Sequence, residues 1–217
     1  MKTKQICVMD VVATKLFAAA LALFLIFAFS TCDNDSTRKK PGTKKTYSIG
    51  DTGPGGGTIF YYDEKGFKMT DTGKKAYYLE AAPSGEGYLK WLSNSSFYET
   101  EVVGISTAIG TGRNNTTLIL NILGENNAPA AKACKDAAYN GKTDWFLPSK
   151  DELNKLYENL RELLEDGSVE YWTSSQCLYT GGGSGEFRAW TQRFSDGRPS
   201  QAVTVYDMYK VYAIRAF

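Results

Sequence analysis

Residues 144–164, DWFLPSKDELNKLYENLRELL, contain the pattern that decides the fold class. Ser149 stands three residues before Glu152, which is the spacing of a capping box, where each side chain bonds the other residue's backbone N–H. Behind this cap, apolar residues recur at the helical period: Leu153, Leu156, Tyr157, Leu160, Leu163 and Leu164. The pattern predicts an amphipathic helix from Ser149 to Gly167 that packs against a core.

A second helix is expected at 128–139 (APAAKACKDAAY), which is Ala-rich, has Pro129 in its first turn and is followed by Asn140-Gly141. The flanking regions have β-type composition, and strands are expected at 47–49, 58–62, 76–82, 171–175, 188–194 and 211–217. Strands, two helices and then further strands predict an α+β domain with segregated elements.

Two segments between these elements predict loops. Residues 50–57 (GDTGPGGG) read as a tight turn in which glycine permits positive φ, because no Gly-Lys-Ser/Thr follows to make a phosphate cradle. Residues 84–127 are polar and weakly periodic, which predicts a long irregular excursion. Trp91 and Phe97 are expected to anchor that excursion to the core.

The first 31 residues have the pattern of a signal peptide. Lys2, Lys4 and Lys15 flank the apolar run 16–29 (LFAAALALFLIFAF), which is short for a bilayer-spanning helix of about 20 residues. Residues 32–46 are polar and read as a tether, so the exported domain covers 47–217. An ordinary secreted protein cleaved nearby and an uncleaved anchor remain alternatives.

Composition excludes several classes of chemistry. The 217 residues include no histidine, so neither a Ser-His-Asp nucleophile nor an imidazole zinc ligand is possible. The formal net charge of +1 argues against a nucleic-acid partner, which needs a basic surplus. No metal and no cofactor are expected. Cys134 and Cys177 remain in an exported, disulfide-permissive domain, either bridged or as separate thiols.

Catalytic residues are not expected. The candidate carboxylates are Glu80, Asp151, Glu152 and Asp207, but Glu152 belongs to the cap and no two others stand at a spacing that implies one site. Cys177 has no neighbouring charge in the sequence that would lower the pKa of its thiol. The chain is therefore expected not to be an enzyme.

The C-terminal quarter has the composition of a recognition surface. Residues 174–180 and the following Gly-rich stretch 181–185 combine Tyr, Ser and Gly, as adaptable binding loops do. Aromatic and arginine side chains are the usual hot spots, and the candidate ligand-binding residues are Trp172, Tyr179, Trp190, Arg193, Arg198, Tyr206 and Tyr209. A sugar ring could stack on such Trp or Tyr rings. A core role is equally open for Trp172 and Trp190.

Cys32 follows the small residues Ser30 and Thr31 directly after the apolar run and resembles the lipidated cysteine of bacterial lipoproteins. This resemblance implies that Cys32 becomes the first mature residue, carries acyl chains and anchors the chain to a membrane. The expected location is the outer membrane or the cell surface.

The exported domain also resembles a known family along most of its length. Seven segments carry the resemblance in order: 47–62 (YSIGDTGPGGGTIFYY), 78–83 (YLEAAP), 107–112 (TAIGTG), 130–134 (AAKAC), 144–153 (DWFLPSKDEL), 171–175 (YWTSS) and 211–217 (VYAIRAF). They resemble the domain shared by many bacterial exported lipoproteins and by the C-terminal domain of the Legionella collagen-like adhesin. That family is similar to the C-type-lectin-like fold of formylglycine-generating enzymes and retroelement-diversified variable proteins.

The resemblance implies a C-type-lectin-like α+β domain of antiparallel strands and two helices, in which the first and last strands pair and long irregular loops lie on the far side. It implies adhesin-type binding of a glycan or protein. The sequence lacks the Glu-Pro-Asn or Gln-Pro-Asp and Trp-Asn-Asp triplets of calcium-dependent lectins, and Cys134 is badly placed to serve as a catalytic pair with Cys177. A retroelement-diversified display protein, an enzyme and a structural envelope lipoprotein remain alternatives.

Overall fold

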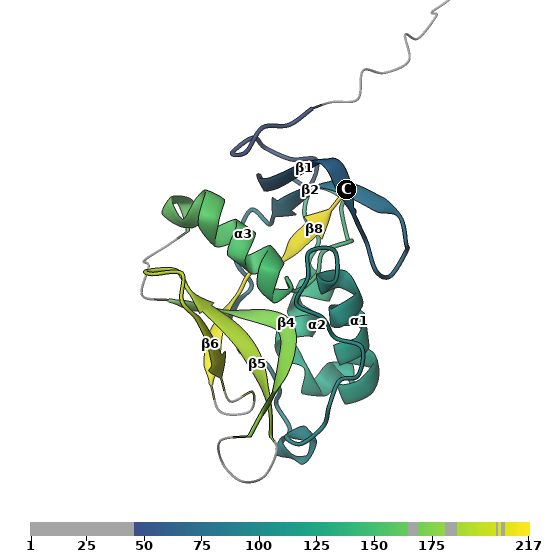
Figure 1. Ribbon diagram of the computed structural model, residues 1–217, viewed down its shortest axis with the longest axis vertical. Helices are drawn as coiled ribbons and strands as arrows, with labels where there is room; N and C mark the ends of the chain where they lie inside the picture. The colour runs from purple at the N-terminus through teal and green to yellow at the C-terminus, as the bar shows by residue number, and fades with distance from the viewer. Residues whose placement is uncertain (1–45, 165–168, 181–185, 203, 205–206) are drawn as a thin grey trace, which may run out of the picture. The chain divides into compact units, whose positions relative to one another are not determined.

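A computed structural model of the chain describes residues 46–164, 169–180, 186–202, 204 and 207–217. Helices and antiparallel and mixed sheets make up this part, which confirms the expected α+β class (Figure 1). Residues 45–217 form one compact unit by their internal contacts.

Three strands form the sheet that carries both ends of the domain. They are β1 (Thr58–Lys68), β2 (Lys75–Ala81) and β8 (Ile214–Ala216), in the order β1-β2-β8 and antiparallel throughout. The expected pairing of the first and last strands is wrong, because β2 lies between β1 and β8. The expected strand at 47–49 is also wrong. The Asp51 carboxylate accepts the Ser48 N–H at 2.8 Å, which favours a turn there.

A second sheet has five strands. In the order β3-β7-β4-β5-β6 these are Gly87–Lys90, Met208–Val211, Glu170–Tyr179, Glu186–Arg193 and Pro199–Ala202. Only the β4–β7 pair is parallel among these pairings, and β4 shifts register between Trp172 and Gln176. The strand expected over 211–217 is split, because β7 ends at Val211 in this sheet and β8 begins at Ile214 in the other.

Three α-helices are present in the described chain instead of the expected two. They are α1 (Gly112–Leu123), α2 (Pro129–Asp136) and α3 (Lys150–Leu160), with short 3-10 turns at Ser95–Phe97, Glu125–Asn127 and Arg161–Leu163. The Ser149–Glu152 capping box is confirmed. Helix α3 ends before its expected end at Gly167, which lies outside the described residues. Helix α1 lies inside the stretch 84–127, which was expected to be irregular. The sequence does not predict this helix, because its Asn and Thr residues have weak helix propensity.

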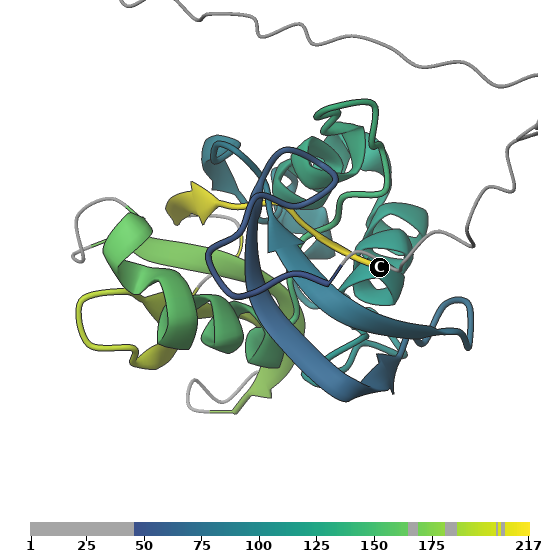
Figure 2. The same cartoon turned by 90° about the horizontal axis from the view of Figure 1, so that it is seen from above.

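Two clusters of buried side chains form the core. One joins α1 and α2 to the five-stranded sheet and includes Trp91, Trp145 and Trp172. Trp91 is buried and Phe97 packs against the same cluster, as expected. The other joins the three-stranded sheet to α3 and to the start of β4. Helix α3 therefore lies between the two sheets (Figures 1 and 2).

The glycine-rich loop 50–57 wraps a buried carboxylate. Glu80 is fully buried and accepts the Gly55 N–H at 2.8 Å and the Gly57 N–H at 2.9 Å. A Cβ at Gly53 would lie 2.4 Å from the Glu80 carboxyl carbon, and one at Gly57 would lie 1.8 Å from a backbone oxygen. Positive φ occurs at only two of the loop's glycines, Gly50 and Gly56, so close approach explains more of the motif than turn geometry does.

Arg215 supplies the positive charge for this carboxylate. Its Nη1 donates to Glu80 at 3.0 Å, and its Nε and Nη2 donate to the two oxygens of Asp144 at 2.8 and 3.1 Å. Burial acts to raise the pKa of Asp144, but the hydrogen bonds and charge of Arg215 outweigh it and hold that pKa below its ordinary value. Arg215 thus bonds the buried Glu80 carboxylate and the Asp144 carboxylate at the same time.

Candidate functional site

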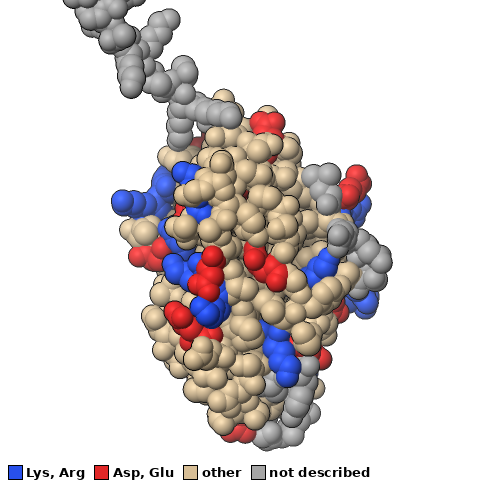
Figure 3. All heavy atoms as spheres, turned by 180° about the vertical axis from the view of Figure 1, so that it is seen from behind, with Lys and Arg blue, Asp and Glu red and all other residues tan. Residues whose placement is uncertain are grey.

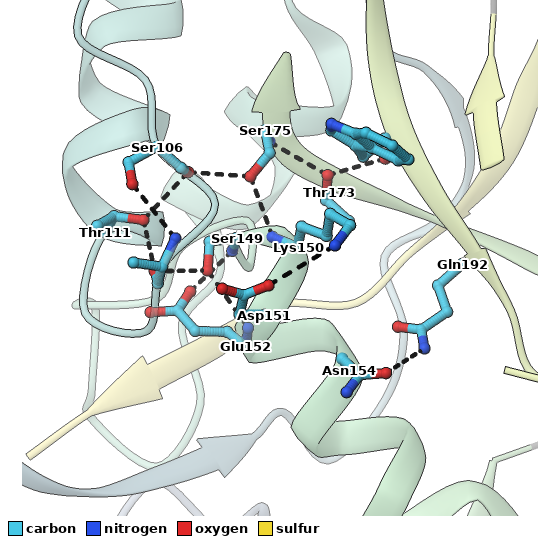
Figure 4. Close-up of polar contacts among 12 residues, drawn as sticks. Ser106, Thr111, Ser149, Lys150, Asp151, Glu152, Asn154, Thr173, Ser175 and Gln192 are labelled. Carbon is cyan, nitrogen blue, oxygen red and sulfur yellow. Dashed lines mark hydrogen bonds and ion pairs between the residues drawn. The ribbon is translucent and has the colours of Figure 1, made fainter. Parts of the chain in front are cut away.

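A small pocket of about 150 Å³ opens beside the first turn of α3. Its lining comes from α3, β5 and the start of β6: Lys150, Asp151, Asn154, Gln192 and Pro199 (Figure 4). A larger hollow of about 520 Å³ follows Tyr157–Glu162, but consecutive residues of one helix end line it. Side chains that converge from separate elements are the better mark of a binding site. A hollow of about 430 Å³ between Pro83–Gly87, Tyr171 and Lys210 also meets this criterion. The pocket at α3 is the candidate because it combines charged and amide side chains with the nearby Trp190 ring.

Glu152 fixes the first turn of α3, next to the pocket. Its side chain is fully buried and accepts the N–H groups of Ser149 at 2.7 Å, Gly110 at 2.8 Å and Gly112 at 3.5 Å. A Cβ at Gly112 would lie 2.2 Å from Glu152 Oε2, which explains the glycine there. The first turn of α3 is thereby joined to the loop that precedes α1.

Burial dominates the acidity of this carboxyl group. It raises the pKa of Glu152 to about 7, although hydrogen bonds from Ser149, Gly110 and Gly112 favour the ionised form. The carboxyl group that holds the first turn of α3 therefore has a pKa near neutral pH.

Three buried hydroxyl residues of β4, Thr173, Ser174 and Ser175, bond β4 to the start of α3, to β5 and to the segment that leads into α1. Ser175 Oγ donates to Ser106 O at 3.0 Å and accepts the Lys150 N–H at 3.0 Å, while Thr173 Oγ1 donates to Trp190 O at 2.8 Å. Asn115 Nδ2 donates to Ser174 Oγ at 3.2 Å. The prediction that a recognition loop begins at Ser174 is wrong, because Ser174 and Ser175 are completely buried in this network.

Two amide side chains are locked against each other at the pocket. Gln192 Nε2 donates to Asn154 Oδ1 at 2.7 Å and to Gly197 O at 3.1 Å, and Asn154 Nδ2 donates to Glu158 at 2.7 Å. With its amino group engaged, Gln192 presents its amide oxygen on the side facing Lys150 (Figure 4). The pocket thus has a hydrogen-bond acceptor whose orientation is set in advance.

Lys150, which lines the pocket, also lies beside an aromatic ring. Lys150 Nζ lies 5.2 Å from the centroid of the half-buried Trp190 ring and 3.8 Å from Asp151 Oδ1. The ammonium donates only, and the Asp151 carboxylate accepts only. A donor (Lys150), two acceptors (Asp151 and Gln192) and the Trp190 ring are therefore close together in space.

The expected ligand-binding residues are only partly brought together. Trp190, Arg193 and Arg198 lie on β5 or in the turn after it, near the pocket; Arg193 bonds Asp196 at 2.6 Å and Arg198 is exposed. Tyr179 is the last residue of β4 and does not line the pocket; the Arg188 guanidinium lies 3.5 Å from its ring centroid.

The other candidates lie away from the pocket. Trp172 has the core role that the sequence left open: it is fully buried, and its Nε1 donates to Leu89 O at 2.8 Å. Tyr209, on β7, packs edge-on against Trp172. Tyr206, the stretch 181–185 and Cys32 lie outside the described residues.

Sequence reasoning missed Lys150, Asn154 and Gln192 as pocket residues. Lys150 and Asn154 are four residues apart, which places them on one helix face and was a usable signal. Gln192 is 38 residues from Asn154 and has no local pattern that announces their contact.

The carboxylates considered for catalysis do not converge on one site. Glu80 is paired with Arg215, Glu152 is held in the cap, and Asp207 precedes β7. Cys134 and Cys177 are separate thiols, and burial raises the pKa of both, which disfavours the reactive thiolate. Over the described ranges, no three His, Cys, Asp or Glu side chains gather as a metal site would require.

None of the helices in the described part of the chain has the length and apolar character to span a bilayer.

No protein-family model matches the chain, and no curated protein matches it.

Proposed function

We propose that the chain is an exported bacterial lipoprotein, anchored through lipidated Cys32, whose domain at 47–217 has a C-type-lectin-like fold and binds an extracellular ligand. The class of ligand that the pocket at α3 fits best is a glycan, with a protein surface as the second class. The proposed activity is binding without catalysis.

The observation that carries this proposal is the combination of Trp190 with Lys150, Asp151 and Gln192. Sugar hydroxyls both donate and accept hydrogen bonds, so a glycan site needs acceptors such as Gln192 Oε1 and Asp151 beside a donor such as Lys150. An indole ring offers an apolar face for the C–H groups of a sugar ring.

Rigidity supports the same proposal. Gln192 is held by Asn154 and Gly197, while the backbone of Lys150 is held by Ser175. Side chains fixed before the ligand arrives lose little conformational entropy on binding. A shallow pocket then suffices for a weak, specific interaction that many copies on a surface reinforce.

The test places the domain, residues 46–217, on an array of neutral and sulfated glycans together with extracellular-matrix proteins. Trp190→Ala and Gln192→Ala variants are compared with Tyr88→Ala, which removes an aromatic side chain that is 50% exposed on β3, the far edge of the same sheet. Circular dichroism and thermal unfolding verify that each variant is folded.

We expect saturable glycan binding that falls at least about tenfold in the two pocket variants and is unchanged in Tyr88→Ala. Binding that all three variants retain would move the site elsewhere. Binding to matrix proteins alone would favour a protein ligand, and an inert domain would overturn the adhesin-type assignment.

The proposed anchor is tested separately. Cells that express the full chain are fed a radiolabelled fatty acid, and incorporation is compared among the unmodified chain, Cys32→Ser and Cys7→Ser. Label that disappears only in Cys32→Ser supports acylation at that residue, whereas label in all three proteins contradicts it.

A further inference from the structure

An aromatic cluster lies where the described chain enters and leaves the domain. The Tyr47 ring meets Tyr78 and Phe217 edge-on, with centroids 5.5 and 5.6 Å apart, and Tyr78 stacks on Tyr62 and Phe217 at 4.9 and 5.4 Å. We call Tyr47, Tyr62, Tyr78 and Phe217 the tether-end cluster. Tyr62 lies on β1 and Tyr78 on β2 of the three-stranded sheet, and Phe217 is the C-terminal residue, whose end is marked in Figure 2.

Part of this cluster is presented to solvent. Tyr62 is 46% exposed, Tyr47 and Phe217 are partly exposed, and Ile49, two residues beyond Tyr47, is 43% exposed. In the space-filling view, residues other than Lys, Arg, Asp and Glu cover most of the upper end of the domain, with a few acidic and basic residues among them (Figure 3). Apolar and tyrosine side chains gathered at one end of a domain mark a surface for a partner.

The chain itself indicates which partner is within reach. The Tyr47 N–H donates to the Tyr78 hydroxyl at 3.4 Å, so the polypeptide from Cys32 joins the domain at the cluster. Fifteen steps along the chain separate Cys32 from Tyr47, and a fully extended chain covers at most about 50 Å over that length. An anchor at Cys32 therefore keeps the cluster at a high effective concentration beside the bilayer, where a weak contact is enough.

Charge and side-chain chemistry match that partner. Tyrosine is enriched at membrane–water interfaces, because its ring is apolar and its hydroxyl remains hydrated. The tether carries Arg38, Lys39, Lys40, Lys44 and Lys45 against two acidic residues, Asp33 and Asp35. Lys65 and Lys75 are exposed on the same strands as Tyr62 and Tyr78, although Asp63 and Glu64 oppose them. Basic residues near a bilayer are attracted to anionic headgroups.

We infer that the tether-end cluster docks on the lipid bilayer, with Ile49 and Tyr62 entering the headgroup region and the pocket at α3 left open to the side. This inference rests on the proposed anchor at Cys32. It adds a second lipid contact, made by the folded domain itself, that fixes how the domain is oriented on the membrane.

The test holds the chain on vesicles without relying on acylation. Residues 33–217, with a hexahistidine tag in place of the acylated residue, bind vesicles of phosphatidylethanolamine, phosphatidylglycerol and a nickel-chelating lipid. In a Cys177→Ser background, an environment-sensitive NBD fluorophore is placed at Ile49→Cys or, as a control, at Val103→Cys. Val103 is 67% exposed, and its neighbour Val102 is bonded to Gln176 of β4.

We expect a lipid-borne doxyl quencher to reduce emission from position 49 about twofold and to leave position 103 nearly unchanged. Adding Tyr62→Ser should return position 49 to the control level while thermal unfolding shows that the domain is intact. Equal quenching at both positions would overturn the inference.

Two further outcomes would also overturn it. Emission at position 49 that depends on the density of protein on the vesicle, and not on the quencher, would assign the cluster to a second copy of the chain. Emission that responds to neither would leave the cluster facing water. Because the tag replaces the lipid, a failed fatty-acid labelling experiment contradicts the anchor without deciding the docking result.

Discussion

Glu80 and Glu152 are both completely buried and both bonded to glycine N–H groups, yet their surroundings differ in charge. Glu80, in the three-stranded sheet, forms an ion pair with Arg215 at 3.0 Å. Glu152, in the first turn of α3, is held by the backbone N–H groups of Ser149, Gly110 and Gly112. Glu80 thus has a buried cation beside it, whereas the first turn of α3 depends on a carboxyl group whose pKa burial raises to about 7.

The two buried carboxylates also explain two glycine motifs. A Cβ at Gly53, Gly57, Gly110 or Gly112 would strike a buried carboxylate or a backbone carbonyl, and one at Gly55 would strike the Trp145 ring. Each carboxylate gathers a loop around itself, and each loop needs glycine to come close enough. Substitutions that change the partners of the two carboxylates should therefore separate the two regions.

The largest expected effect follows from Arg215→Met. Removing the guanidinium leaves Glu80 buried without its cation, and breaking such a pair costs about 3–5 kcal/mol. Urea unfolding at pH 7 measures the loss. Lys155→Met is the control, because its partner Glu158 is on the surface and such a pair contributes under about 1 kcal/mol.

Arg215→Met/Glu80→Gln adds a second control. We expect the double variant to recover part of the stability lost in Arg215→Met, because the uncompensated charge is gone. A loss in Arg215→Met no larger than in Lys155→Met would contradict the importance assigned to this ion pair.

An intermediate effect concerns the pH dependence at Glu152. Its pKa of about 7 in the folded protein lies above the ordinary value of 4.5, so the folded state binds this proton more tightly. The contribution of this group to stability is greatest below pH 4.5, falls as pH rises from 4.5 to 7 and is constant above that. The decline is at most about 3 kcal/mol.

Unfolding free energies measured between pH 4.5 and 8 check this expectation. Glu152→Gln should remove the decline, because the amide does not ionise, whereas Glu80→Gln should leave it in place. If the unmodified chain and Glu152→Gln decline equally, the titrating group lies elsewhere.

The smallest of the three effects follows from Ser149→Ala. Ser149 Oγ accepts the Glu152 N–H and donates to Ala108 O, and losing an N-cap side chain costs about 1 kcal/mol. Thermal unfolding at pH 7 measures it, with the exposed Ser195→Ala as the matched control. An equal melting temperature for both variants would mean that backbone N–H groups alone secure the start of α3.

The extent to which the fold could be predicted depended on how local each signal was. The capping box and leucine stripe of α3 lie within 16 residues of one another, and both were recognised. Helix α1 has no such local pattern. Its Thr116 exchanges hydrogen bonds with the backbone of Leu147, 31 residues away, and only tertiary structure supplies that partner.

The candidate site shows the same limit. Trp190 was predicted to bind ligand from its residue type. Residue type alone did not distinguish it from Trp172, which is fully buried on β4 next to the register shift of that strand. The Asn154–Gln192 contact joins a helix to a strand, and its members are ordinary polar residues in the sequence. Residue type suggested the chemistry, while long-range pairing decided which residues share a pocket.

The contact between Tyr47 and Phe217 also makes a circular permutation of the domain feasible. With ring centroids 5.6 Å apart, the two ends of the fold could be joined by a short linker and the chain reopened at the exposed turn between β1 and β2. Such a circular permutant keeps every strand pairing of the fold. It would move the point of attachment from the aromatic end to the hairpin, and so turn the pocket to a new direction relative to whatever carries the domain.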